Sequence, residues 1–318
     1  MTKGKNLSLA AAIPAFAMAL CAPAAAQDGG ETGAQDAPSG NDIVVEGERT
    51  DRREVLRTTR DITRRPRADG DPVARFQREV CPGVWGLSPE NAQLVIDRIY
   101  DNAERAGIPV NEEAECGANL WVIFVDDPAA TFAQLREDSE FLVDGLSRLD
   151  VRRVESQEGP VRAWNIVTTR NREGEIVTSG FENAAGTAQG RTGSVGVPNN
   201  PVTQMSRLDS AVRLDLDMSV MLVQRSAIAD LDAFALADYA TMRLLAQTEP
   251  PERENVSDTV LTLFSPDAEG FPPDRLTAFD RAYLQSVYDS SPTRPNRLAL
   301  RNVRSNMERE LESEASGE

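Results

Sequence analysis

Apolar residues recur along the chain with two periods, and these periods predict where helices and strands lie. Between residues 88 and 107 they are spaced three and four apart, which is typical of a helix that buries one face. Ser88 and Pro89 suit the start of this helix, and Gly107 suits the position just beyond its end. The same spacing predicts further helices at 129–157, in two pieces broken near Gly145, and at 234–247, 275–288 and 297–314.

Strand patterns lie between these helices. Residues 120–125 form a continuous run of large apolar side chains, which predicts a strand buried on both faces. Residues 211–224 alternate between apolar and polar side chains, which predicts a long strand with one buried face, and 161–169 favours another strand. Residues 259–264 favour a short strand or an extended piece. Isolated strands mixed with helices indicate an α+β fold, a single mixed-sheet domain with packed helices that spans residues 72–318.

Two parts of this domain have distinct patterns. Residues 183–201 consist mostly of Gly, Ala, Asn, Thr and Pro, which predicts a long flexible loop or lid. The segment 297–314 repeats apolar residues on a charged background and predicts an amphipathic helix. Such a helix either docks on its own domain or meets a partner.

The first 26 residues have the features of a secretory signal peptide. Lys3 and Lys5 precede an apolar stretch, and an Ala-x-Ala site ends at Ala26. The stretch is short for a membrane span, so the mature chain is expected to have no transmembrane segment. The expected location is the periplasm. The alternatives are release from the cell, association with the outer membrane through lipidation of Cys21, or retention by an uncleaved anchor.

Residues 27–71 predict a disordered arm, because large apolar side chains are scarce between Gly, Ala, Asp and Ser. The arm contains one β-branched run, Ile43-Val44-Val45, which is the candidate partner-binding strand. An arginine-rich stretch follows between Arg49 and Arg67, and it predicts contact with an acidic face of the domain or with anionic lipid head groups.

The composition then excludes much of enzymology. The chain has no histidine, and its only lysines are Lys3 and Lys5. Catalytic triads and the histidine zinc helix need imidazoles, and P-loops, kinases and pyridoxal enzymes need a lysine. Neither a cofactor nor a metal site is expected. The net charge of −17 argues against nucleic acid as a partner.

Cys81 and Cys116 are the cysteines that remain after signal cleavage. In an exported chain, two cysteines most simply form one disulfide. The alternative is a reactive thiol, whose pKa only an arginine or a helix terminus could lower here.

Only carboxylates, tyrosine and arginine remain as candidate catalytic groups. Asp215 and Asp217 resemble the paired aspartates of aspartyl-phosphate phosphatases, but the alternation predicts that they lie on a solvated sheet face with Arg213 and Ser219. A cation site there is the alternative. Asp126 and Asp127 at a strand end suit either ligand binding or a helix N-cap before Pro128.

Two stretches resemble known families. Residues 42–49, Asp-Ile-Val-Val-Glu-Gly-Glu-Arg, are similar to the Ton box of TonB-dependent outer-membrane receptors. That segment adds as a strand to the periplasmic protein TonB. The resemblance implies TonB as a partner of the arm, although a receptor barrel does not fit in this chain. The alternative is that the segment docks on its own domain.

The second resemblance covers roughly residues 76–311. The order of Leu236–Arg243, Leu261–Phe264 and Leu276–Leu284 is similar to an uncharacterised family of exported Gram-negative proteins, itself loosely like zincin metalloproteases. It implies that helix 234–247 takes the place of the zinc helix and that the later Leu-Thr-x-x-Asp helix packs beneath it. Asp238 and Tyr239 stand where zinc chemistry would be, so they mark a candidate cleft without catalytic power.

These observations predict an exported, non-catalytic envelope protein that binds a partner on a degenerate protease-like scaffold. The alternative is a hydrolase that uses only carboxylates, for example one acting on glycans. A pair of carboxylates in a deep cleft, one of them buried, would favour the enzyme.

Overall fold

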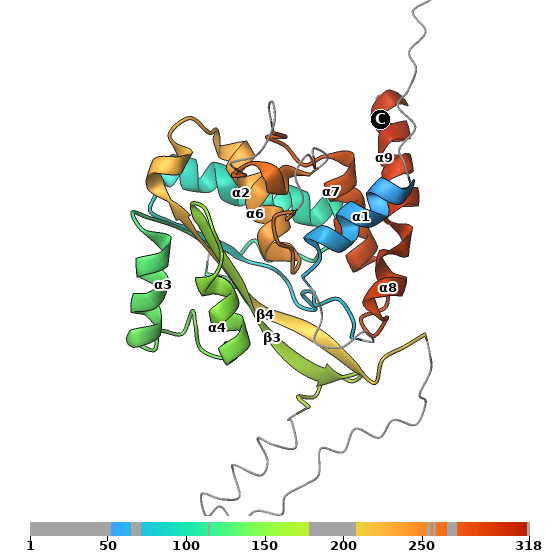
Figure 1. Cartoon of the computed structure of the whole chain (residues 1–318), viewed down its shortest axis with the longest axis horizontal. Coiled ribbons are helices and arrows are strands. Elements are labelled where there is room, and N and C mark those ends of the chain that lie inside the picture. Colours follow the sequence, from blue (N-terminus) through green and yellow to red (C-terminus); the bar gives the residue numbers. More distant parts are fainter. Residues whose placement is uncertain are drawn as a thin grey trace, which may run out of the picture. The chain divides into compact units, whose positions relative to one another are not determined.

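The structure is a computed structural model, and it describes residues 52–64, 71–113, 115–177, 208–252, 256, 259–265 and 272–316. The predicted signal peptide 1–26, the arm segment 42–49 and the predicted loop 183–201 lie outside these residues. The described residues belong to one compact unit, Arg49–Glu318. One mixed sheet with helices on both faces forms its centre, which confirms the predicted α+β class (Figure 1).

The sheet has the strand order β1-β2-β4-β3. Strands β1 (Pro82–Trp85), β2 (Leu120–Val125) and β4 (Val212–Gln224) run parallel, and β3 (Val161–Asn171) is antiparallel to β4 at one edge. The continuous apolar run of β2 places it between two strands, as its pattern predicts. Strand β1 escaped prediction because it has four residues and only one of them is fully buried.

Helices cover both faces of the sheet (Figure 1). The larger core lies under α2 (Pro89–Arg105), α6 (Ala233–Leu245) and α7 (Ala278–Tyr288). The smaller core lies under α3 (Pro128–Glu137) and α4 (Arg148–Glu155), around Trp164. Gly145 has a φ of 86° between α3 and α4, which explains why the predicted helical region is broken there.

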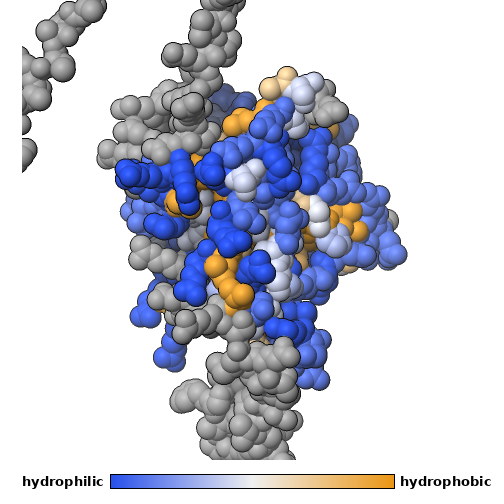
Figure 2. All heavy atoms as spheres, turned by 90° about the vertical axis from the view of Figure 1, so that its right-hand side faces the viewer, coloured by the Kyte–Doolittle hydropathy of each residue, from blue (hydrophilic) through white to orange (hydrophobic). Residues whose placement is uncertain are grey.

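The C-terminal part differs in detail from the prediction. The expected continuous helix begins as α8 (Asn296–Ala299), passes through a 3-10 turn (Leu300–Asn302) and continues as α9 (Val303–Ser316). Its apolar side docks on α7 through the buried Leu300, Val303 and Met307. The face with α1, α8 and α9 shows mostly hydrophilic side chains and small separate apolar patches (Figure 2). Within the described residues, no helix has the length and apolar character to cross a membrane.

The prediction for residues 259–264 is wrong. Residues 259–264 do not form a strand, because Thr259 accepts the Leu261 N–H and starts a 3-10 turn (Val260–Thr262). A second short 3-10 helix, Arg225–Ile228, follows β4.

The folded part also begins before residue 72. Helix α1 (Arg52–Ile62) packs on the domain through Val55, Thr58, Thr59 and Ile62. The apolar pattern of α1 is incomplete because two buried positions are threonines. The Thr59 hydroxyl donates a hydrogen bond to the Val55 carbonyl at 2.7 Å, so this buried hydroxyl needs no water as a partner.

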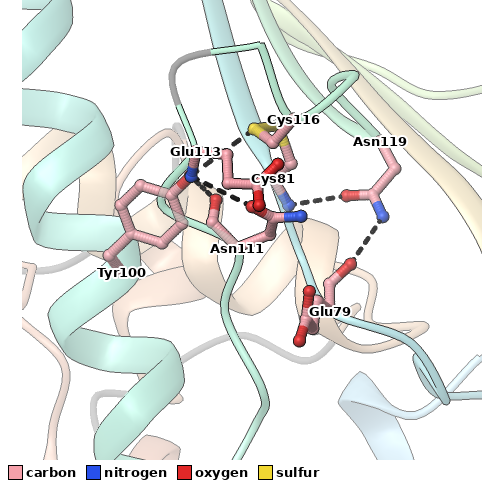
Figure 3. The surroundings of a disulfide bond; sticks show 7 residues. All are labelled: Glu79, Cys81, Tyr100, Asn111, Glu113, Cys116 and Asn119. Atoms are coloured by element: carbon pink, nitrogen blue, oxygen red, sulfur yellow. Dashed lines mark hydrogen bonds between the residues drawn. A yellow bond between two sulfur atoms is a disulfide. The ribbon is translucent and has the colours of Figure 1, made fainter.

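The predicted disulfide is present and joins Cys81, just before β1, to Cys116, just before β2 (Figure 3). Asn119 strengthens the same junction, because its Oδ1 accepts the Cys81 N–H at 2.9 Å and its Nδ2 donates to the Glu79 carbonyl at 3.0 Å. The Tyr100 hydroxyl of α2 donates to the Asn111 carbonyl at 2.6 Å. The disulfide therefore fixes the end of the sheet where its parallel strands start.

Candidate functional site

Asp238 of α6 is not a cleft residue. Its carboxylate is fully buried and accepts two hydrogen bonds from Arg98 of α2, from Nε at 2.7 Å and from Nη2 at 2.9 Å. Asn102 Nδ2 donates at 2.7 Å and the Leu276 N–H at 3.0 Å. The hydrogen bond to Asp238 raises the pKa of Arg98. With both oxygens engaged by fixed donors, this aspartate holds α2, α6 and the segment before α7 together.

Tyr239 is also inside the core. Its side chain is 1% exposed, and its ring meets Phe264 edge-on at 4.8 Å between centroids. Burial raises the pKa of its hydroxyl. The prediction that Asp238 and Tyr239 mark a cleft is therefore wrong, because helix α6 is packed on all sides.

Asp280 of the Leu-Thr-x-x-Asp pattern completes the same buried region. It accepts the Thr277 N–H at 3.1 Å in a capping box, the Thr259 hydroxyl at 2.6 Å and the Val260 N–H at 2.8 Å. Burial raises its pKa to about 6. Of the three stretches that carry the zincin resemblance, Leu236–Arg243 thus contacts both others, Leu276 through Asp238 and Phe264 through Tyr239.

The paired aspartates of β4 form ion pairs with arginines. Arg170 of β3 lies 3.2 Å from Asp215 and 3.3 Å from Asp217, and Arg213 lies 3.0 Å from Asp215. Burial raises the pKa of Asp215 despite these arginines. The predicted solvated face is wrong here, because Asp215 and Ser219 are buried. A register shift between Ile166 and Val167 changes the alternation between these two positions, and Arg75 pairs with β4 at Asp215.

The acids at the end of β2 have an ordinary structural role. Asp127 is the N-cap of α3, and its Oδ1 accepts the N–H groups of Ala129 and Ala130 at 2.9 and 3.0 Å. Asp126 is exposed and lies 3.5 Å from Arg225. Among the described residues, no group of three or more Asp, Glu or Cys side chains is placed to hold a metal ion.

The best candidate site is a cavity of about 330 Å³ at the free edge of β3, which we call the β3 cleft. Its floor is the sheet face near the end of the β3–β4 pair, where Val167 and Leu214 contribute apolar surface. The start of α4 and the residues around Arg64 and Gln247 form its walls. The full lining is Arg64, Asp71, Gly145, Leu149, Asp150, Arg153, Asn165, Val167, Thr169, Val212, Leu214 and Gln247.

Most of the β3 edge is closed by other parts of the chain. The Gln157 side chain behaves like a one-residue strand, because its amide bonds both the N–H and the carbonyl of Ala163 at 2.8 Å. Beyond the cleft, the Val177 N–H donates to the Thr169 carbonyl at 2.9 Å. Strand residues alternate in direction, so the main-chain groups of Asn165 and Val167 also point away from β4. Among the described residues no partner bonds them, and both positions line the cleft.

The charged groups of the cleft neutralise one another. Asp150 accepts the Ser147 hydroxyl at 2.6 Å and is paired with Arg64 and, at 3.6 Å, with Arg153. Arg153 also lies 3.3 Å from Glu249. The charged side chains of this wall are therefore held in ion pairs, and the cleft also offers apolar side chains and the main-chain groups of Asn165 and Val167.

Comparison with protein-family models, with curated proteins and with solved structures found no match. Sequence reasoning missed the residues of the β3 cleft. One signal was available: Asn165 is a polar residue in core-facing register between Ala163 and Val167.

Proposed function

We propose that this is an exported, non-catalytic binding protein that holds an extended peptide in the β3 cleft. The observation that carries the proposal is that Asn165 and Val167 line the cavity and that their outward main-chain groups have no partner among the described residues. A peptide in strand conformation would bond this edge and place a side chain against Val167 and Leu214. The signal-like N-terminus supports export, with the periplasm as the location.

The pairing of the carboxylates favours binding over hydrolysis. Asp150 in the cleft is held by Arg64 and Ser147, and Asp238 on α6 is held by Arg98. A glycoside hydrolase needs two available carboxyl groups with different proton affinities. The absence of histidine and of lysine beyond Lys5 removes the other common bases. If the fold is zincin-like, the scaffold would keep a peptide-binding cleft but lack the catalytic groups of the zinc helix.

The arm supports the same class of function. Ile43, Val44 and Val45 would pair as a strand with a periplasmic partner such as TonB, in the manner of a Ton box. Deletion of residues 42–49 should abolish TonB binding, and unchanged binding would contradict this part of the proposal.

The test of the cleft uses the labelled peptide acetyl-Thr-Val-Thr-Val-Thr-amide and fluorescence anisotropy. Val167→Pro removes one outward N–H without touching the β3–β4 ladder and should weaken binding about 3–10-fold, the value of one hydrogen bond. Gln157→Ala frees the edge at Ala163 and should strengthen binding several-fold.

Equal affinity of both variants and the parent chain would overturn the placement of the peptide on β3. Mass spectrometry of the peptide after long incubation checks the second half of the proposal. Intact peptide is expected, and cleavage that depends on the protein would show that it is an enzyme.

A further inference from the structure

A second cavity, of about 690 Å³, lies beside helix α4, and we call it the α4 cavity. Helix α4 lines one part of it, and the end of α3 with the turn that joins α3 to α4 lines the rest (Figure 1). Val143, Leu146 and Val151 pack against the smaller core and supply its apolar surface. This volume is typical of a small-molecule site. The α4 cavity shares no lining residue with the β3 cleft, so it is a separate site.

Helix α4 presents two arginines to this cavity. Arg148 and Arg152 are four residues apart, so their side chains lie on one face of the helix. Both are exposed, and neither side chain has an ion-pair or hydrogen-bond partner among the described residues. Further along the same face, Glu155 pairs with Arg136 at 2.5 Å and ties α4 to α3. The two unpaired guanidinium groups offer fixed donors that suit a carboxylate.

The turn between the helices presents two carboxylates to the same cavity. Glu140 and Asp144 are exposed, and within the described part of the chain their side chains have no charged or hydrogen-bonded partner. The turn is anchored to the end of α3, because the Glu140 N–H donates to the Leu135 carbonyl at 3.0 Å. These acids suit an ammonium group. The α4 cavity therefore carries unpaired charges of both signs around an apolar surface.

We propose that the α4 cavity binds a short free peptide by its two charged ends. The peptide carboxylate bonds Arg148 and Arg152. The peptide ammonium group bonds Glu140 and Asp144. A ligand with one charge would complement one of these pairs and be repelled by the other, whereas a zwitterion complements both.

The size of the cavity limits the length of the peptide. Three extended residues span up to about 10 Å, and a peptide of two or three residues suits a site of this volume. An apolar side chain between the ends would cover the apolar surface of the cavity. This inference goes beyond the proposed function, because the peptide is held by its ends and away from β3.

The test titrates the full chain with the tripeptide Ala-Leu-Ala in an isothermal titration calorimeter. The peptide is used with free termini, with an acetylated N-terminus and with an amidated C-terminus. The free form should bind about 5–10-fold more tightly than either capped form, because each cap removes one charge that the cavity complements.

Substitutions assign each end of the peptide to its side of the cavity. Arg152→Gln should weaken binding of the free peptide about 5–10-fold and leave binding of the amidated form unchanged. Glu140→Gln should weaken binding of the free peptide to the same extent and leave binding of the acetylated form unchanged. Arg172→Gln and Glu137→Gln remove the same charges at exposed positions outside the cavity, so these controls should bind like the parent chain.

Equal affinity for free and capped peptides, equal affinity of the variants and their controls, or no binding of the free peptide would overturn the inference. Val167→Pro, which tests the β3 cleft, should leave tripeptide binding unchanged. Weaker tripeptide binding in Val167→Pro, with Arg152→Gln and Glu140→Gln like the parent chain, would overturn the α4 site and support the β3 cleft instead.

Discussion

Replacement of Arg98 by methionine tests whether the acid of α6 is structural. The substitution removes the two hydrogen bonds that Arg98 donates to the buried Asp238 carboxylate. The hydrogen bonds from the Asn102 amide and the Leu276 N–H remain. Removal of one partner of a buried pair costs about 3–5 kcal/mol. Because the Arg98 side chain is 21% exposed, water partly screens the remaining charge, and we expect a loss of about 3 kcal/mol.

The free energy of unfolding is measured by urea titration with tryptophan fluorescence. Arg105→Met is the matched control, because Arg105 lies on the same helix and pairs with Asp101 at an exposed site, 3.0 Å apart, where loss should be below about 1 kcal/mol. Adding Asp238→Asn to Arg98→Met removes the unpaired charge and should restore part of the stability. A double variant less stable than Arg98→Met, or a single variant equal to the control, would refute the structural role of Asp238.

Two further predictions concern stability. Because burial raises the pKa of Asp280 to about 6, the folded chain binds this proton more tightly than the unfolded chain. Its contribution is complete below about pH 4 and is lost as the pH rises to 6, on the order of 3 kcal/mol, and Asp280→Asn should flatten this part of the pH profile of unfolding. Reduction of the Cys81–Cys116 disulfide should lower the free energy of unfolding by about 4 kcal/mol, and an unchanged urea midpoint after reduction would contradict it.

Helices and strands whose apolar residues are regularly spaced could be predicted from the sequence, and those with irregular apolar spacing were missed. Strands β2 and β4 and helices α2, α6 and α7 bury long regular apolar faces, so hydrophobic spacing finds them. Helix α1 buries Thr58 and Thr59 at two of its core positions, and a spacing rule counts these as polar. The turn at 260–262 has apolar residues typical of a strand, but Asp280 from α7 fixes it, and that contact is invisible locally.

The candidate site was beyond sequence reasoning for a related reason. Asp238 and Tyr239 became candidates because the zincin resemblance places them where the zinc chemistry would be. The β3 cleft depends on main-chain groups left open at Asn165 and Val167, and their availability follows from what covers the rest of the edge. The roles of Gln157 and Val177 in that cover appear only once the fold brings them to β3.

The exclusive use of arginine in the described domain links these findings. A guanidinium presents several fixed donors to a carboxylate and is always charged. Arg98, Arg64 and Arg170 form ion pairs with the acids of α6, the cleft wall and β4. The pairing leaves the cleft little net charge. In the proposed binding function, a ligand would therefore be selected mainly by the β3 main chain, which favours a segment that adopts a strand.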